Sequence, residues 1–190
     1  MKVLTGLSNH HVHLTKEAGE TLFGPNYDLT VKRPLRQVGE YACEEVVDIE
    51  KNGKRIEHVR IIGPYRKYTQ VELLHSDCEF FGIEDIRRNS GELNNTHTIK
   101  IIGPMGEYVA HNSGIVAINH VHLSPEEAIN VGVKDKELVD IKLDDGRIIH
   151  DIVVKSADNC LSEFHINKDE ATPYNLENGM EVELCLKLKM

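Results

Sequence analysis

The sequence contains no tryptophan, and aromatic residues make up only 5% of it. A surface of aromatic rings that stacks on nucleic-acid bases is therefore not expected. Positive charge is also scarce, because 22 Lys and Arg are outnumbered by 31 Asp and Glu, which leaves a net charge of −9. Non-specific nucleic-acid binding needs a broadly basic face, so nucleic acid is not an expected partner.

Cysteine and long apolar runs are scarce as well. The four cysteines never occur as a Cys-x-x-Cys pair, which excludes a zinc finger with thiolate ligands. No stretch reaches about 18 apolar residues, and residues 1–11 contain no apolar signal run, so neither a membrane span nor secretion is expected. We therefore expect a cytoplasmic protein with reduced thiols, in which each Cys is more typical of a small core residue than of a nucleophile.

Two short segments occur twice in the chain. HVHLT at residues 11–15 returns as HVHLS at residues 120–124, and IIGP at 61–64 returns at 101–104. The copies are too few for a solenoid. Two related substructures, each contributing one element to a shared site, would account for the repeat, and 190 residues suffice for two small domains.

Strand patterns dominate the chain. Residues 46–62 predict a hairpin around Asn52-Gly53, and residues 139–154 predict a second hairpin around Asp144-Asp145-Gly146. Apolar residues alternate with polar ones from Val182 to Leu188, which predicts a half-buried strand.

Helical signals are short and follow each HVH segment. Ser124, Pro125 and Glu127 form an N-cap, a first-turn proline and a capping-box glutamate, and Thr15 begins a similar helix through Leu22. We predict a mainly β protein with short α-helices, built as two small β-barrels rather than as a doubly wound sheet. The predicted domains are residues 9–115 and 116–190, and the strand at residues 1–8 pairs with the second.

The HVH segments are typical of metal ligands. Alternate side chains of a strand point to one face, so His11 and His13 point together, as do His120 and His122. Two imidazoles placed in this way can bind one metal ion. One pair is weak support, but two copies in the same context, each followed by Leu and a hydroxyl helix cap, favour two metal sites over four core histidines.

Other polar residues are ambiguous by themselves. His165, in EFHIN, is more often a satisfied core or surface histidine, and Glu72 is a ligand, a base or a surface residue. Arg66 precedes Glu72, and its planar guanidinium suits phosphate. The remaining histidines lack a comparable setting and are left out: His10, His58, His75, His97, His111 and His150.

Four segments together resemble the phosphate propanoyltransferase family of phosphotransacylases. They are SNHHVHLT at 8–15, GPYRKYTQVE at 63–72, HVHLSPE at 120–126 and FHINKDEA at 164–171, in the order of the family and over nearly the whole chain. The family has Arg immediately before each His-x-His pair, where this chain has His10 and Asn119. We expect a cytoplasmic enzyme without the N-terminal extension that directs some members of the family into microcompartments.

The resemblance implies two β-barrel domains with a di-zinc active site at their interface. It implies a reaction of acyl-CoA with inorganic phosphate that yields acyl phosphate and coenzyme A, with short acyl groups such as acetyl or propanoyl. One zinc ion would offer its open position to the sulfur of coenzyme A, and Arg66 would bind phosphate. The implied ligands are His11, His13 and Glu72 for that zinc ion and His120, His122 and His165 for the other.

Two alternatives remain open at this point. One is a relative that binds metal and coenzyme A without turnover, and the other is a di-zinc thioester hydrolase, because zinc lowers the pKa of bound water to about 7. The sequence leaves the oligomeric state open, a homodimer included, and gives no reason to expect a membrane partner.

Overall fold

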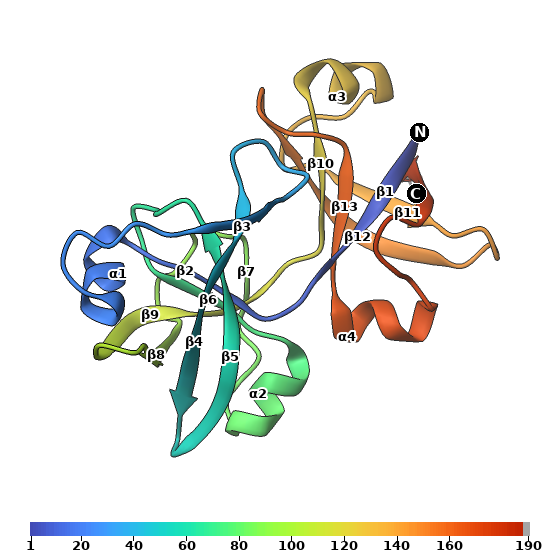
Figure 1. Cartoon of the computed structure of the whole chain (residues 1–190). Coiled ribbons are helices and arrows are strands. Elements are labelled where there is room, and N and C mark those ends of the chain that lie inside the picture. Colours follow the sequence, from blue (N-terminus) through green and yellow to red (C-terminus); the bar gives the residue numbers. More distant parts are fainter. Residues whose placement is uncertain (188–190) are drawn as a thin grey trace. The chain divides into compact units, whose positions relative to one another are not determined.

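The computed structural model describes residues 1–187 (Figure 1). The chain divides into two compact units, which are taken one at a time below. The first unit is Asn9–Ala117. The second unit joins Met1–Ser8 to the part of the chain that begins at Ile118.

The first unit is a closed β-barrel with two short helices. Following the strand pairs from β4 through β5, β2, β6, β9 and β8 leads back to β4, while β3 and β7 lie at the edges. The described elements are β2 (His11–His13), α1 (Lys16–Phe23), β3 (Val31–Pro34), β4 (Tyr41–Lys51), β5 (Lys54–Gly63), β6 (Gln70–Glu72), α2 (His75–Phe81), β7 (Arg87–Arg88), β8 (His97–Ile102) and β9 (Glu107–Ala117).

The second unit is a closed barrel in the order β1-β13-β10-β12-β11-β14. Strand β1, dark blue in Figure 1, runs parallel to β13 near the other end of the sequence. The elements are β1 (Lys2–Ser8), β10 (His120–Leu123), α3 (Pro125–Val131), β11 (Leu138–Lys142), β12 (Ile148–Ser156), β13 (Glu163–Asn167), α4 (Lys168–Ala171), a 3-10 helix (Thr172–Tyr174) and β14 (Glu181–Leu186). The predicted fold class, mainly β with short helices and two small barrels, is confirmed.

Local sequence signals explain the turns. Asn52 and Gly53 join β4 to β5 with φ angles of 52° and 73°, and positive φ at both positions is the pattern that Asn-Gly hairpins favour. Strands β11 and β12 form the second predicted hairpin. The predicted C-terminal strand is β14, and Leu188 lies outside the described residues.

The helix caps also follow the sequence. The Ser124 hydroxyl accepts a hydrogen bond from the Glu127 amide at 3.2 Å, and the Glu127 carboxylate accepts one from the Ser124 amide at 2.8 Å. The Thr15 hydroxyl accepts from the Ala18 amide, so α1 begins directly after β2 as α3 begins after β10. Among the described residues, no helix is long and apolar enough to cross a membrane.

Each barrel has an apolar interior to which alternate residues of its strands contribute. Val12 belongs to the core of the first unit, and Val121 and Phe164 belong to the core of the second. Because neighbours along a strand point to opposite faces, the histidines that adjoin these residues point away from the barrel interior. The predicted core position holds for Cys43 and Cys78 and is wrong for Cys160 and Cys185, which are only half-buried.

Candidate metal centres

The first candidate centre lies on β2 and β6. These antiparallel strands place His11 directly opposite Glu72. Val12 and Val71 lie in the core, so His11, His13 and Glu72 share the opposite face. One ligand atom from each of these three residues lies within 4.8 Å of the others.

The distances suit coordination of one ion. The two Nε2 atoms of His11 and His13 are 3.2 Å apart, and Glu72 oxygens lie 3.5 Å from His11 Nε2 and 3.9 Å from His13 Nε2. Two ligands bound to one tetrahedral zinc ion at about 2.0–2.1 Å are about 3.3–3.4 Å apart. The separation of the two histidine nitrogens and the distance from Glu72 Oε2 to His11 are close to such an edge, and the distance from the other carboxylate oxygen, Oε1, to His13 is longer.

The hydrogen bonds of these histidines decide which nitrogen is available. His11 Nδ1 donates to the Asn9 carbonyl at 2.8 Å, and His13 Nδ1 donates to the Ile62 carbonyl at 3.0 Å. A carbonyl oxygen only accepts, so the neutral ring carries its proton on Nδ1 and leaves a lone pair on Nε2. Two lone pairs and a carboxylate then converge, and this arrangement fits a cation.

Burial favours the neutral histidine that a metal requires. Burial lowers the pKa of His13 well below its ordinary value, and the nearby charges of His11 and Arg66 lower it further. The unprotonated ring is therefore the stable form at neutral pH.

The second candidate centre lies on β10 and β13. Antiparallel pairing places His120 opposite His165, and the Nε2 atoms of His120 and His122 are 3.2 Å apart, as in the first centre. His120 Nδ1 donates to the Ile118 carbonyl at 2.8 Å. The His165 ring centroid lies 5.1 Å from that of His120 and 4.8 Å from that of His122. One ligand atom from each of the three histidines lies within 4.8 Å of the others.

Two histidines of the second centre, His120 and His122, are also held neutral. Burial lowers the pKa of His120 well below its ordinary value and that of His122 to about 3, and nearby positive charge contributes to both shifts. Part of that charge is Lys155, which lies opposite His122 in the pairing of β10 with β12. The sequence analysis missed Lys155, because only strand pairing connects it with the HVH segment.

Gln70 is a second residue that the sequence analysis missed. Its side chain is fully buried and donates to Glu72 at 2.7 Å and to Ser90 at 2.9 Å, while its own oxygen accepts from the Gly91 amide at 2.8 Å. Gln70 thereby fixes the orientation of the Glu72 carboxylate. A signal was present, since residues 70 and 72 of a strand share a face.

Arg66 lies beside the first centre. Its guanidinium pairs with Glu40 at 2.5 Å and donates to Ser90 at 3.4 Å, and its backbone amide donates to the Leu14 carbonyl. Its charge contributes to the low pKa of His13. The fold thus places Arg66, the predicted phosphate-binding residue, close to His13, a predicted zinc ligand.

His10 and Asn119, the residues that precede the two HVH segments, each contact a carboxylate. His10 Nδ1 lies 3.0 Å from Asp77, and Asp77 also accepts from the Leu74 amide at the start of α2. Asn119 donates to Glu170, and its oxygen accepts from the Asn167 amide at the start of α4. Both side chains therefore connect the ligand strand to the start of a helix.

The chain is similar to known proteins over most of its length. A sequence model of a family described as phosphate propanoyltransferase matches residues 4–177. A phosphate propanoyltransferase of Thermotoga maritima is 41% identical over 93% of this chain and 86% of the relative. Proteins of the same name from Limosilactobacillus reuteri and Rhodopseudomonas palustris are 39% and 35% identical, over 92% and 98% of this chain and 82% and 83% of the relatives.

The matched region includes every residue of both candidate centres as well as Arg66. The family model covers most of the chain, and identities of 35–41% extend over more than nine-tenths of it. The chain belongs to the phosphate propanoyltransferase family, a family of acyltransferase enzymes.

Proposed function

We propose that this protein is a zinc-dependent enzyme that transfers a short acyl group, such as acetyl or propanoyl, between coenzyme A and inorganic phosphate. The observation that carries the proposal is the convergence of histidine nitrogens in both centres. Family membership supports the same reaction, because the relatives are named phosphate propanoyltransferases.

Each centre would hold one zinc ion through three protein ligands. Three ligands leave a coordination position open, which is typical of catalytic rather than structural zinc. A zinc ion in such a site stabilises a thiolate and polarises a bound oxygen. The proposed ligands are His11, His13 and Glu72 in the first centre and His120, His122 and His165 in the second.

Arg66 would bind phosphate beside the first centre. Glu40 and Ser90 engage two of its five donors, so a planar guanidinium held in place keeps donors for an anion. Lys155 adds positive charge at the second centre. Fixed positive charge is needed wherever two anionic substrates react, because their mutual repulsion opposes the encounter.

The proposed reaction needs no acid or base beyond these groups. A phosphate oxygen attacks the thioester carbonyl carbon, a carbon–oxygen bond forms, and the carbon–sulfur bond breaks. The sulfur leaves with the electron pair as the thiolate of coenzyme A. The histidines would hold the metal and would not be needed as proton donors to that thiolate.

The test is an assay of metal-replete protein with acetyl-CoA or propanoyl-CoA, with and without phosphate. Free thiol and acyl phosphate are measured together. We expect thiol release that depends on phosphate and is matched by acyl phosphate. Thiol release without phosphate would indicate a hydrolase, and retention of coenzyme A without turnover would indicate a binding protein; either result contradicts the proposal.

A variant pair makes the assay specific to the site. His120→Ala removes one proposed ligand, and we expect it to abolish turnover. His150→Ala is the matched control, because His150 is an exposed histidine of the same unit that belongs to neither centre. We expect it to leave the rate unchanged.

A further inference from the structure

We infer that Glu163 is a positioning residue of the second centre, which holds the Nε2–H of His165 and so leaves Nδ1 of that ring as its metal-binding nitrogen. The inference rests on the proposed function, since it concerns how this centre would hold zinc. It gives His165 the opposite ring orientation to that of His11, His13 and His120, each of which donates from Nδ1 to a backbone carbonyl.

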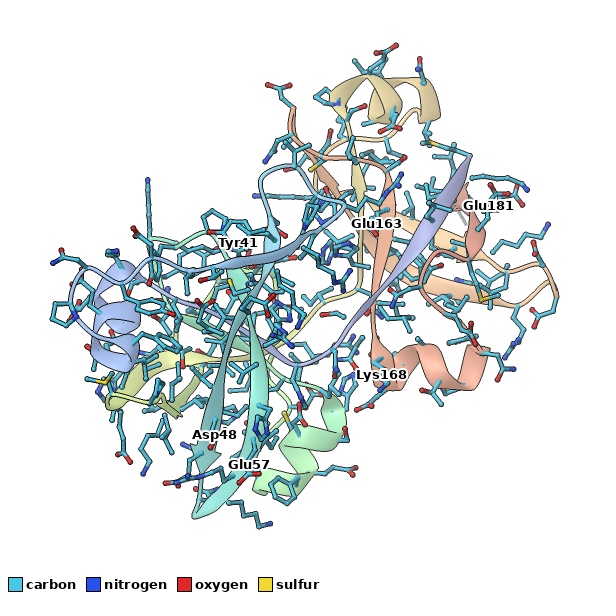
Figure 2. All side chains as sticks on the ribbon, in the orientation of Figure 1. Tyr41, Asp48, Glu57, Glu163, Lys168 and Glu181 are labelled. Carbon is cyan, nitrogen blue, oxygen red and sulfur yellow. The ribbon has the colours of Figure 1, made fainter. Side chains whose placement is uncertain are left out.

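Strand geometry places Glu163 on the ligand face. Glu163 and His165 flank Phe164 on β13, and Phe164 is fully buried in the barrel core, so the two polar side chains share the other face. Across the strand pair, Glu163 lies opposite His122 and His165 lies opposite His120. Figure 2 labels Glu163 at the beginning of β13.

Glu163 and His165 are joined by a hydrogen bond, and their contacting atoms are too close together to be two ligands of one zinc ion. Glu163 Oε2 lies 2.7 Å from His165 Nε2. A charge-assisted N–H···O⁻ bond has a length of about 2.7–2.9 Å. Two atoms bound to one tetrahedral zinc ion would be separated by about 3.3 Å. The distance therefore fits a carboxylate that accepts the imidazole proton.

The orientation of the ring gives an independent argument. A Cβ atom on Gly6 would lie 2.9 Å from His165 Cδ2 and 3.0 Å from Glu163 Oε1, so this edge of the ring faces β1. Strand β13 lies between β1 and β10 in the barrel. The Nδ1 edge, on the other side of the ring, therefore faces β10, which carries His120 and His122.

A carboxylate in this position would strengthen the ligand. It selects the tautomer with the proton on Nε2, restricts rotation of the ring and makes the coordinating nitrogen more basic. Removal of such a partner typically lowers metal affinity by about 10–100-fold. Because residue 6 is a glycine, no side chain from β1 occupies the space next to the Glu163 carboxylate and the His165 ring.

The first experiment uses the unmodified protein loaded with zinc. Long-range proton–nitrogen NMR spectra distinguish the metal-bound nitrogen from the protonated nitrogen of each histidine. We expect zinc on Nδ1 of His165 and on Nε2 of His120. Zinc on Nε2 of His165 would overturn the inference, and this measurement needs no variant to fold.

The second experiment measures zinc affinity by chelator competition, with the His120 and His165 ring signals reporting on the second centre. Glu163→Ala should weaken zinc there by about 10–100-fold, whereas Glu163→Gln, which keeps an acceptor oxygen, should weaken it less. Glu181→Gln is the matched control, because Glu181 is an exposed glutamate of the same unit paired with Lys2. Unchanged affinity in Glu163→Ala would also overturn the inference.

These outcomes differ from failure of the proposed function. If the unmodified protein binds zinc at the second centre but the Glu163 variants and the ring assignment do not behave as expected, only the role of Glu163 is wrong. If the unmodified protein shows no zinc-induced shift of the His120 signals, zinc binding at this centre is contradicted, and the inference falls with it.

Discussion

At the residue scale, the two centres depend on the contacts that surround their histidines. Nδ1 of His11, His13 and His120 is engaged by a backbone carbonyl, so the tautomer is selected by the fold and not by the metal. The partners of His122 and His165 are instead side chains, a cysteine sulfur at 3.3 Å and a carboxylate. Substitutions at these surrounding residues should therefore affect the metal without removing a ligand.

Gln70→Leu should weaken zinc at the first centre by about 10–100-fold, because Glu72 loses the donor that orients its carboxylate. Chelator competition measures this. Ser113→Ala is the control, since Ser113 is also buried in the first unit but donates to the Ala110 carbonyl. Both variants should lose about 1 kcal/mol or more of stability, and only Gln70→Leu should lose zinc. Equal zinc affinity in the two variants would contradict the role of Gln70.

Arg66→Ala should raise KM for phosphate by about tenfold or more, which corresponds to about 1.4 kcal/mol and to one charge-assisted hydrogen bond. Its KM for acyl-CoA should change less. Steady-state kinetics with each substrate varied in turn provide the measurement. Lys67→Ala, at the exposed neighbouring cation, should behave as the unmodified protein. A phosphate KM that does not move would exclude Arg66 as the phosphate ligand.

At the scale of elements, each centre is built where a strand is followed directly by a capped helix. Strand β10 is followed by Ser124 and α3, and β2 is followed by Thr15 and α1. The buried residue between ligand and cap, Leu123 or Leu14, anchors each strand in its core. The position of each ligand strand therefore depends mainly on its core leucine and only partly on the stability of the helix that follows.

Ser124→Ala should lower the free energy of unfolding by about 1 kcal/mol, because the first turn of α3 loses its side-chain cap. Denaturant unfolding of the metal-free protein measures the change. Zinc affinity should remain within about twofold, since Leu123 still holds β10 in place. Glu127→Gln, which can still accept from the Ser124 amide, should cost less. A large loss of zinc in Ser124→Ala would show that the cap supports the centre.

At the scale of the whole molecule, the two units have separate hydrophobic cores and separate ligand sets. We expect close to two zinc equivalents per chain in protein purified without chelators. His120→Ala should reduce the count to about one, because the first centre keeps all three of its ligands. Elemental analysis tests this, and an unmodified protein without zinc would refute the metal assignment.

Stability should depend on pH in a defined direction. The pKa values of His13, His120 and His122 are lower in the folded protein than their ordinary value, so below about pH 6.5 the unfolded chain binds more protons. Stability is therefore complete above this pH and falls as the pH decreases toward about 3, the folded value for His122. Zinc should be released toward the lower end of this range, because protonated imidazole cannot bind it and burial keeps these rings neutral in the folded chain until the pH is low. Activity lost below pH 6.5 with zinc still bound would identify a different titrating group.

The sequence by itself was enough for the local features. Period-two alternation predicted which histidines share a face, Asn52-Gly53 predicted a hairpin, and Ser124 with Glu127 predicted a helix start. These features depend on residues a few positions apart, whose backbone geometry relates them directly. The resemblance of four segments to one family was also visible in the sequence, and the comparisons confirm it.

Only the tertiary structure decided how distant residues meet. Pairing of β2 with β6 brings Glu72 to His11, and pairing of β10 with β13 brings His165 to His120. Pairing also brings Lys155 to His122. Gln70 and Glu163 differ, because each lies two residues from a ligand on its own strand, where strand alternation already places it on the ligand face. The physical reason is that strand register and barrel closure depend on packing across the whole core, so same-strand neighbours can be read locally, whereas partners on other strands cannot.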